Sequence, residues 1–542
     1  MIKLAFVTPI PCYMRQYALL ATFAVILISL LSGCGQKKAQ QQLPQISIFC
    51  DHIESVARQN GISFSEAAAK IKEIGFAGAD VRVFQKPEEI RILDSLGFGH
   101  SCAITDIDYS KGDQTELEDK TLAFMEENGY DRLLLVTGLM PKEGFSSQDI
   151  ATARQRIAAF ASRVKGRGYT IMVEDYDSPR SLCYNAERLD SLFAVAKDLG
   201  LVFDSGNFQF AGEDSMEQLE HFLGRVGHVH LKDRASVNDM TCVPIGTGCI
   251  PVGSVIRTLV KNGYCGWLTV EQFGSGNMLE DCAVSFSNIS KAIEMSNPDN
   301  VGPKALVLYY SQSSTTKAVA REISNRLCAD IEAIVPVVPY DGDFQATVER
   351  GRKEREEGVL PEIQPLKSDI KSYDIIFLGY PIWFGTYAPP IATLLNSQDF
   401  SGKKVVPFCS FGSGGLDSST KDLKDKLPNV EILPGYGVRA ARVDAIPCEI
   451  DRFLKENGFI DGEITKLEDF PAAHPVSDEE SALFDAAVGN YPMIQAKASE
   501  VASRPVPGGT EYLFTAASTP NPIKVYVLVE DGKDPVFTQV LR

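Results

Sequence analysis

Several common functional motifs are missing from this chain of 542 residues. None of its 12 cysteines forms a Cys-x-x-Cys pair, and we assign no zinc site. Neither a Gly-x-Gly-x-x-Gly fingerprint nor a Walker lysine loop occurs, which argues against a dinucleotide or ATP as the ligand. Basic residues are in deficit, because 53 Lys and Arg stand against 71 Asp and Glu, for a net charge of −18. A nucleic acid must be met by a basic face, so we expect small-molecule ligands and no nucleic-acid partner.

The composition that is present is that of ordinary globular protein, 44% hydrophobic and 23% charged. A chain of this length exceeds a single hydrophobic core, and the length alone suggests two to four domains. The boundaries between them are expected where turn-rich or polar segments interrupt the periodic patterns.

The N-terminus has the pattern of an export signal. Residues 18–31 form an almost uninterrupted apolar stretch after Arg15, shorter than the roughly 20 residues needed to span a bilayer. The stretch ends in Leu31-Ser32-Gly33-Cys34, which resembles the lipobox of bacterial lipoproteins and implies that Cys34 becomes the lipidated first residue. A plain secretory signal or a short anchor is the alternative. We expect a signal peptide over residues 1–34, a tether over 35–44, and a lipid-anchored protein on the extracytoplasmic side of a membrane in the bacterial cell envelope.

Eight short apolar runs alternate with helical patterns between residue 45 and about residue 296. This alternation predicts the α/β class and a (β/α)8 TIM barrel of about 250 residues. Helical patterns include Phe64–Ile74, Thr121–Asn128, Ile150–Lys165 and Ala186–Leu199. The expected strands are Ile46–Phe49, Gly78–Arg82, His100–Ile104, Arg132–Val136, Tyr169–Glu174, Leu201–Asp204, His228–Leu231 and Trp267–Glu271.

Four side chains able to bind a metal stand at the ends of the last four expected strands: Glu174, Asp204, His230 and Glu271. Singly, each acidic residue is more simply a solvated or helix-capping carboxylate, but barrels of this type place their active sites at the C-terminal ends of the strands. Oxygen-rich ligands with one imidazole suit Mn²⁺ or Mg²⁺, with Co²⁺ or Zn²⁺ also able to bind, better than a thiolate-preferring metal. The set as a whole therefore predicts a divalent-metal site.

This arrangement resembles the sugar phosphate isomerase/epimerase family of xylose isomerase-like barrels, over roughly residues 45–296. The resemblance implies that all four side chains hold the metal and that Glu174 and Glu271 also move the proton. The metal would polarise the carbonyl and hydroxyl of a sugar or sugar derivative and stabilise an enediolate. Many ketose epimerases carry a histidine where this chain has Asn207, so the substrate stays open. The residues that the resemblance places toward the sugar are Asn207, His228 and Lys232.

A second α/β pattern follows a turn-rich linker at residues 297–303. The buried-strand run Ala305–Tyr310 leads into a hydroxyl-rich loop, Ser311–Lys317, and then into the helical pattern Ala318–Leu327. Such a loop offers hydrogen-bond donors at a helix N-terminus, where the helix dipole favours phosphate. Two more strands end in loops, at residues 375–386 and 405–415.

The three loops resemble those of flavodoxin, across about residues 303–460. The resemblance implies that the first loop holds the phosphate of FMN and that the other two flank its isoalloxazine ring, with Trp383 stacked on the ring. Aromatic residues in such a domain are otherwise core residues, and Ser314 and Thr315 replace the Gly and Asn of the commoner phosphate loop. The residues expected to bind the cofactor are Ser311, Ser313, Ser314, Thr315 and Thr316, then Tyr380, Pro381, Trp383 and Gly385, then Cys409, Gly412 and Gly414.

The remaining residues, 463–542, predict an accessory α+β domain. A helical pattern over Asp478–Ser503, interrupted near Pro492, precedes expected strands at Glu511–Ala517, Ile523–Glu530 and Val536–Leu541. This order faintly resembles cystatin-like domains, although the leading glutamine of their inhibitory loop is missing, and we infer no inhibitory activity.

Together these patterns predict a metal-dependent isomerase or epimerase acting on a sugar-like small molecule, fused to an FMN redox domain with an unidentified redox partner. The rival hypothesis is an FMN electron-transfer lipoprotein whose barrel binds a sugar without catalysis. Cys242 and Cys249 lie in one loop and could form a disulfide or stay free, so no disulfide is assigned.

Overall fold

The computed structural model describes residues 41–541, except 144–145, 237–238, 301, 341–343, 465–466, 490, 492–493, 495 and 519–521. The expected signal peptide, Cys34 and most of the expected tether lie outside the described residues. Within the described part, no helix combines the length and the apolar character needed to cross a membrane.

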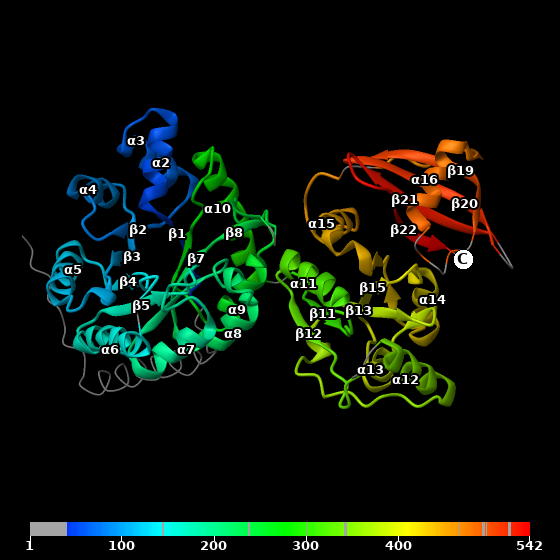
Figure 1. The fold of residues 1–542 in the computed structure, drawn as a ribbon, viewed down its shortest axis with the longest axis horizontal. Helices are drawn as coiled ribbons and strands as arrows, with labels where there is room; N and C mark the ends of the chain where they lie inside the picture. The colour runs from blue at the N-terminus through cyan, green and yellow to red at the C-terminus, as the bar shows by residue number, and fades with distance from the viewer. Residues whose placement is uncertain are drawn as a thin grey trace, which may run out of the picture. The chain divides into compact units, whose positions relative to one another are not determined.

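Eight parallel strands close into a barrel in the order β1-β10-β7-β6-β5-β4-β3-β2 (Figure 1). The (β/α)8 prediction is confirmed, and each strand lies within two residues of its expected bounds. The apolar runs form strands because a parallel barrel strand packs against helices on its outer face and against other strands' side chains on its inner face. The strands are β1 (Gln45–Phe49), β2 (Gly78–Arg82), β3 (Gly99–Asp106), β4 (Arg132–Val136), β5 (Thr170–Glu174), β6 (Gly200–Asp204), β7 (Val226–Leu231) and β10 (Trp267–Val270).

Helices cover the outside of the barrel (Figure 1). Their sequence signals are local, as at α3, where the Ser63 side chain and Glu66 form a capping box. Inside the barrel, an apolar layer that includes Phe49, Met172 and Val202 fills the space between the strands. The helices are α2 (Cys50–Asn60), α3 (Phe64–Ile74), α4 (Pro87–Ser95), α5 (Thr115–Asn128), α6 (Ser147–Arg163), α7 (Ala186–Val195), α8 (Ser215–Phe222), α9 (Val252–Lys261) and α10 (Met278–Ser296).

The long interval before the last barrel strand holds a hairpin where the sequence suggested only a loop. Its strands are β8 (Asp233–Ser236) and β9 (Asp239–Val243), which pair antiparallel. Buried Asp233 anchors the segment that follows, because its carboxylate accepts hydrogen bonds from the backbone N–H groups of Gly246, Gly248 and Ile250. All ten cysteines from Cys50 onward are free thiols in the structure, including Cys242 and Cys249.

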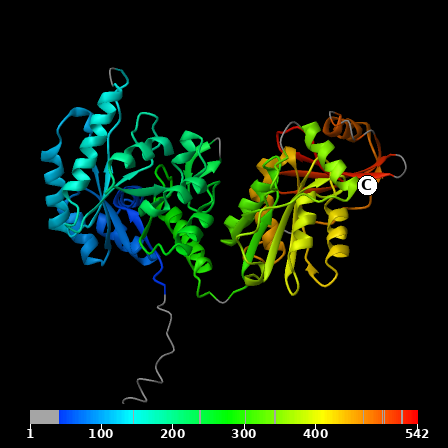
Figure 2. The same cartoon turned by 90° about the horizontal axis from the view of Figure 1, so that it is seen from below.

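The second α/β region has the expected doubly wound parallel sheet, in the order β12-β11-β13-β15-β16 with β17 also paired to β15. Helices α11 and α15 cover one face, and α13 and α14 cover the other (Figure 2). This strand order is that of flavodoxin-like folds, in which ligands bind outside the carboxyl ends of the strands. The elements are β11 (Ala305–Tyr309), α11 (Thr315–Leu327), β12 (Asp330–Ala333), α12 (Phe344–Glu357), β13 (Ile375–Trp383), β14 (Thr386–Tyr387), α13 (Pro389–Ser397), β15 (Lys404–Phe411), α14 (Leu416–Lys426), β16 (Glu431–Ile432), β17 (Tyr436–Arg439) and α15 (Ile446–Glu456).

The C-terminal region is a five-stranded antiparallel sheet with one helix packed on it through Phe484 and Val488. The expected helix over Asp478–Ser503 is wrong beyond α16 (Asp478–Val488), because the residues from Lys497 pair with β20 as a strand. Pairing across the sheet overrides the helix propensity of Ala and Glu in that segment. The strands are β18 (His474–Pro475), β19 (Lys497–Val506), β20 (Gly509–Ala517), β21 (Ile523–Glu530) and β22 (Val536–Leu541).

Candidate metal site and flavin loops

The four predicted metal ligands converge at the C-terminal mouth of the barrel. One donor atom from each of Glu174, Asp204, His230 and Glu271 lies within 4.8 Å of the other three. Glu174 and Asp204 are the last residues of β5 and β6, His230 is in β7, and Glu271 directly follows β10. Because β7, β6, β5 and β10 lie in one continuous part of the barrel wall, with β10 next to β7, their ends aim these side chains into one space.

One hydrogen bond and three ion pairs mark the point where the donor atoms meet. Nδ1 of His230 is 2.5 Å from Oε1 of Glu174 and 3.2 Å from Oε2 of Glu271. The Lys232 ammonium lies 3.0 Å from Oδ2 of Asp204 and 2.8 Å from Oε1 of Glu271. The carboxylates of Glu174 and Glu271 thus meet at Nδ1 of His230, and those of Asp204 and Glu271 meet at the Lys232 ammonium. Carboxylate oxygens with one imidazole nitrogen are donors that a divalent cation accepts, so the residues present fit the expected metal.

The electrostatics of the cluster depend on burial and on these charge pairs. Burial would lower the pKa of Lys232, yet Asp204 and Glu271 outweigh it and raise that pKa well above its usual value. The pKa of Glu271 is held well below its usual range by Lys232 and His230, against the effect of burial. Burial raises the pKa of Asp204 to about 7, although Lys232 acts in the opposite direction. Without a metal, Asp204 is therefore a carboxyl of the cluster whose protonation changes near neutral pH.

The three residues expected to face the sugar lie at different depths. Lys232 and Asn207 lie at the cluster, where the Lys232 ammonium donates to Oδ1 of Asn207 at 2.9 Å. His228 is fully buried and contacts Asp80 and Thr269. It stands two residues before His230 on the same strand, which places it on the same inward face but about 6–7 Å deeper in the barrel.

Sequence reasoning missed Asp80, which lies beneath the cluster on β2. Its Oδ2 accepts from Nε2 of His228 at 2.9 Å and from Nε2 of His230 at 3.1 Å. Its Oδ1 accepts from the hydroxyls of Ser101, at 2.5 Å, and Thr269, at 3.0 Å. Burial would raise the pKa of Asp80, but the two histidines lower it well below its usual value. The only signal in the sequence was an acidic residue inside an otherwise apolar strand run, Gly78-Ala79-Asp80-Val81.

Donor atoms of Asp80, His228 and His230 also lie within 4.8 Å of one another. All three side chains are fully buried, and Asp80 already accepts four hydrogen bonds. We therefore interpret this group as a hydrogen-bonded support for His230. The contact between Asp80 and Nε2 of His230 leaves Nδ1 as the His230 nitrogen that faces the carboxylates.

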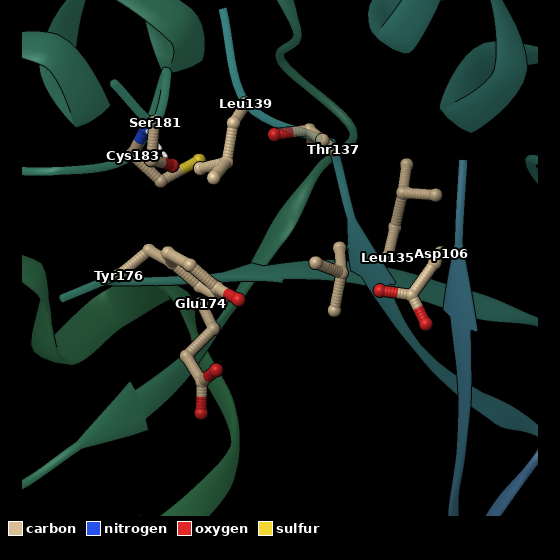
Figure 3. A pocket seen from close by; sticks show the side chains of 10 residues that line it. Asp106, Leu135, Thr137, Leu139, Glu174, Tyr176, Ser181 and Cys183 are labelled. Carbon is tan, nitrogen blue, oxygen red and sulfur yellow. Dashed lines mark hydrogen bonds between the residues drawn. The ribbon is translucent and has the colours of Figure 1, made fainter. Parts of the chain in front are cut away.

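A cavity of about 240 Å³ adjoins the cluster, with Glu174 in its wall (Figure 3). Asp106 and Leu135 line one side and Ser181 and Cys183 another. Strands β3 and β4 and the loop after β5 contribute the wall, at the same end of the barrel as the four ligands. The cavity is therefore where a substrate next to a metal would lie.

In the second region, the first predicted flavin loop has a left-handed backbone at a position where the commoner loop has glycine and this chain has serine. Ser314, at the position of the glycine in the commoner loop, has φ +65°, in the left-handed region, and it is the N-cap of α11. A non-glycine residue there is strained, and such strain concentrates at functional loops. Ser313 and Ser314 are exposed, whereas Thr316 is buried and its hydroxyl is 2.8 Å from that of Ser410.

Trp383 is half-buried at the end of β13. Its ring meets those of Tyr310 and Tyr340 edge-on, with ring centroids 5.9 and 5.1 Å apart. Helix α12 packs closely here, because a Cβ on Gly351 would lie 3.1 Å from the Trp383 ring. The indole is therefore held in one orientation while part of it stays open to solvent.

The other residues predicted to bind flavin differ in how far their side chains are exposed to solvent. Tyr380, Pro381 and Cys409 are buried, so only their backbone is available to a cofactor. Gly385 and Gly412 are exposed. In the third loop the carbonyl of Ser413 accepts a hydrogen bond of 2.6 Å from the N–H of Val540, so β22 also contacts this loop.

Comparisons with known proteins agree with this architecture. Residues 68–292 match the family model of the xylose isomerase-like TIM barrel, and residues 304–444 match that of flavodoxin. Inosose dehydratase from Clostridium perfringens is 22% identical over 262 residues, which cover 41% of this chain and 85% of that protein. D-Allulose 3-epimerase from Methylomonas sp. is 14% identical over 47% of this chain and 99% of its own, with a TM-score of 0.38. A flavoprotein in complex with FMN from Lactobacillus acidophilus is 25% identical over 25% of this chain and 93% of its own, with a TM-score of 0.24. The chain thus joins a xylose isomerase-like TIM barrel to a flavodoxin domain.

Proposed function

We propose that the barrel is a metal-dependent isomerase or epimerase that moves a proton at a carbon next to a carbonyl in a sugar-like substrate. The observation that carries this proposal is the convergence of Glu174, Asp204, His230 and Glu271 beside a cavity. When bound there, a divalent cation would polarise the carbonyl and hydroxyl oxygens of the substrate.

The protein's own groups account for the proton transfers. Glu174 lines the cavity and acts as the base, because its carboxylate is the one ligand of the four that borders the space beside the cluster. Glu271 lies 2.8 Å from the Lys232 ammonium on the other side of the cluster, so it can act as the second proton carrier by passing on a proton that it takes from Lys232. Proton return by this second carboxylate gives isomerisation or epimerisation.

A dehydratase is the second candidate, supported by the similarity to inosose dehydratase over 85% of that protein. Dehydration begins with the same proton removal next to a carbonyl, and it differs in that a neighbouring hydroxyl then leaves. Product analysis of one reaction separates the two candidates: an isomeric sugar supports the first, and loss of water supports the second.

The test of the barrel uses Glu174→Gln and Glu271→Gln in the metal-loaded protein. Each should suppress deuterium exchange at the substrate carbon by about 10²–10⁴-fold, the usual contribution of a positioned acid or base. Glu54→Gln, on α2 and outside the cluster, is the control and should exchange normally. Normal exchange in both glutamate variants would reject the proposal. An inert barrel beside a redox-active flavodoxin domain would instead support the rival electron-transfer function.

We further propose that the flavodoxin domain binds FMN. Supporting this are the match to the flavodoxin family model, the exposed hydroxyls of Ser313 and Ser314 at the start of α11, and the orientation of Trp383. FMN would supply one- or two-electron transfer. Titration of the flavin-free protein with FMN tests this, and the absence of measurable binding would mean that the fold persists without its cofactor.

Export and lipid attachment through Cys34 are also proposed, on the sequence pattern alone. Cys34→Ser should remove the lipid and move the protein from the membrane fraction to the soluble fraction, or leave it unprocessed. A wild-type protein that carries no lipid would refute this proposal.

A further inference from the structure

The third flavin loop, which follows β15, contacts the C-terminal region at three consecutive residues. Strand β22 is an edge strand of the C-terminal sheet, so its outward backbone groups have no strand partner. One of them, the N–H of Val540, donates to the carbonyl of Ser413 at 2.6 Å. A Cβ on Gly412 would lie 2.8 Å from the Tyr491 hydroxyl, and one on Gly414 would overlap the Val540 carbonyl. The loop therefore covers the open edge of β22.

This contact gives a physical reason for the two glycines of the loop. Neither Gly412 nor Gly414 has a positive φ, so the backbone conformation does not itself require glycine. Glycine is also used where another backbone must approach closely. The sequence resemblance assigned both glycines to the cofactor, whereas in the structure the group that needs the space at Gly414 is the backbone of β22.

Arg439, the last residue of β17, joins the same loop to the C-terminal region through one side chain. Its Nε donates to the carbonyl of Gly412 at 3.0 Å, and its Nη1 donates to the carbonyl of Phe537 at 2.5 Å. Its Cζ also lies 3.3 Å from the centroid of the Phe537 ring. Because β17 pairs with β15 and sets Arg439 opposite Phe411, this bridge stands at the carboxyl edge of the sheet, where ligands of such folds bind.

We propose, resting on the FMN-binding function above, that the C-terminal region holds the third flavin loop in the shape that binds FMN, with Arg439 as the positioning residue that joins the two. The planar guanidinium suits this task, because it donates in two directions while its face packs on a ring. A loop that is already held binds its ligand more tightly, since less conformational freedom is lost on binding. The C-terminal region thus contributes to FMN affinity through the loop that it holds.

The first experiment titrates FMN into the flavin-free, full-length wild type and Arg439→Gln. Loss of the bridge should weaken FMN binding about ten-fold, the usual scale for a lost hydrogen bond from a charged group. Arg504→Gln is the matched control. Arg504 also donates to a backbone carbonyl, that of Glu468, and packs on a ring, that of Phe470, but both partners belong to the C-terminal region. The control should bind FMN as the wild type does.

Arg439→Lys separates positioning from charge. Lysine keeps the positive charge but has a single ammonium in place of the fork, so it cannot reproduce both hydrogen bonds and the ring contact together. Positioning by Arg439 therefore predicts that Arg439→Lys weakens FMN binding nearly as much as Arg439→Gln does. Wild-type affinity in Arg439→Lys, beside weak binding in Arg439→Gln, would mean that the charge attracts FMN directly, and it would overturn the inference.

Amide hydrogen exchange in the flavin-free proteins measures the bridge without FMN. The amide of Val540 should be protected in the wild type and should exchange faster in Arg439→Gln, while amides within β20 and β21 keep their protection. Unchanged exchange at Val540 would overturn the inference. If β20 and β21 also lost protection, the variant would have lost its fold, and Arg439→Lys would carry the test in its place.

The two measurements separate this inference from the proposed function. A wild type that binds no FMN would overturn both. A wild type that binds FMN, with an affinity that Arg439→Gln leaves unchanged, would overturn the inference alone and leave the FMN-binding function standing.

Discussion

Replacement of Asp80 should weaken metal binding although Asp80 is not one of the four converging ligands. Its Oδ2 accepts from Nε2 of His230 at 3.1 Å, so it holds the proton on that nitrogen and leaves Nδ1 to face Glu174 and Glu271. Outer partners of this kind orient a ligating histidine, and their loss typically costs 10–100-fold in metal affinity.

The size of the effect should depend on the replacement. In Asp80→Asn, the amide oxygen can face the two histidines while its NH2 group faces the hydroxyls of Ser101 and Thr269, which can accept. We therefore expect about a ten-fold loss of metal affinity. In Asp80→Ala, the N–H groups of His228 and His230 lose their buried acceptor, and about a 100-fold loss is expected. Breaking a buried charge pair should also lower the free energy of unfolding by about 3–5 kcal/mol.

Competition with a chromophoric chelator measures the metal affinity, and nitrogen chemical shifts of the histidines report the tautomer of His230. Asp94→Asn is the matched control, because it removes another Asp–His contact, 2.8 Å from His100, at the surface. If Asp80→Asn and Asp80→Ala folded and bound metal as tightly as the wild type, with the tautomer of His230 unchanged, the supporting role of Asp80 would be refuted.

Three other results are expected. Lys232→Met should tighten metal binding and destabilise the metal-free protein, because the ammonium that neutralises Asp204 and Glu271 is lost. Thermal unfolding with and without Mn²⁺ measures both effects. An equal increase of the unfolding temperature by Mn²⁺ in wild type and variant would contradict this prediction. Asp204, with its pKa raised to about 7, keeps a proton that an unfolded-chain aspartate loses near pH 3.9, so its contribution to metal-free stability falls as the pH rises from about 4 to 7. Metal uptake should accordingly release about one more proton at pH 6 than at pH 8, measured by calorimetry in two buffers, and Asp204→Asn should abolish the difference. Trp383→Ala should weaken FMN binding by about 1–3 kcal/mol, measured by fluorescence titration, and an unchanged affinity would exclude stacking.

The positions of the barrel strands could be predicted because buried parallel strands are short apolar runs, and the four candidate ligands stood out as polar residues that end such runs. Asp80 and His228 gave a weaker signal. Both lie within strands, one layer below the mouth, and a sequence shows alternation along a strand but not the depth at which each inward side chain sits in a closed barrel. Whether an inward polar residue meets a substrate or another polar residue depends on the stagger of neighbouring strands.

The C-terminal region shows a second limit of sequence reasoning. Lys497–Ser503 contains good helix formers and few of the β-branched residues that favour strands, so its composition predicted a helix. In the structure this segment pairs along its length with β20, and Val501 is buried against Phe514 in the small core. Strand propensity depends on the partner strand, which lies outside the local window from which a helix is predicted.

Both candidate sites lie at the carboxyl ends of parallel strands, where the loops that follow the strands gather at one edge of the sheet. In the barrel, the ends of β5, β6, β7 and β10 supply the donor atoms, and in the flavodoxin domain the loops after β11, β13 and β15 supply the cradle. Each set of ligand groups comes from one sheet alone. The groups of each candidate site therefore come from separate strands, so a variant of Glu174 or Asp204 changes no residue of the flavin loops. The two candidate sites share no ligand group among the described residues, although Lys317 of the first flavin loop lies 3.4 Å from Glu217 on α8 of the barrel.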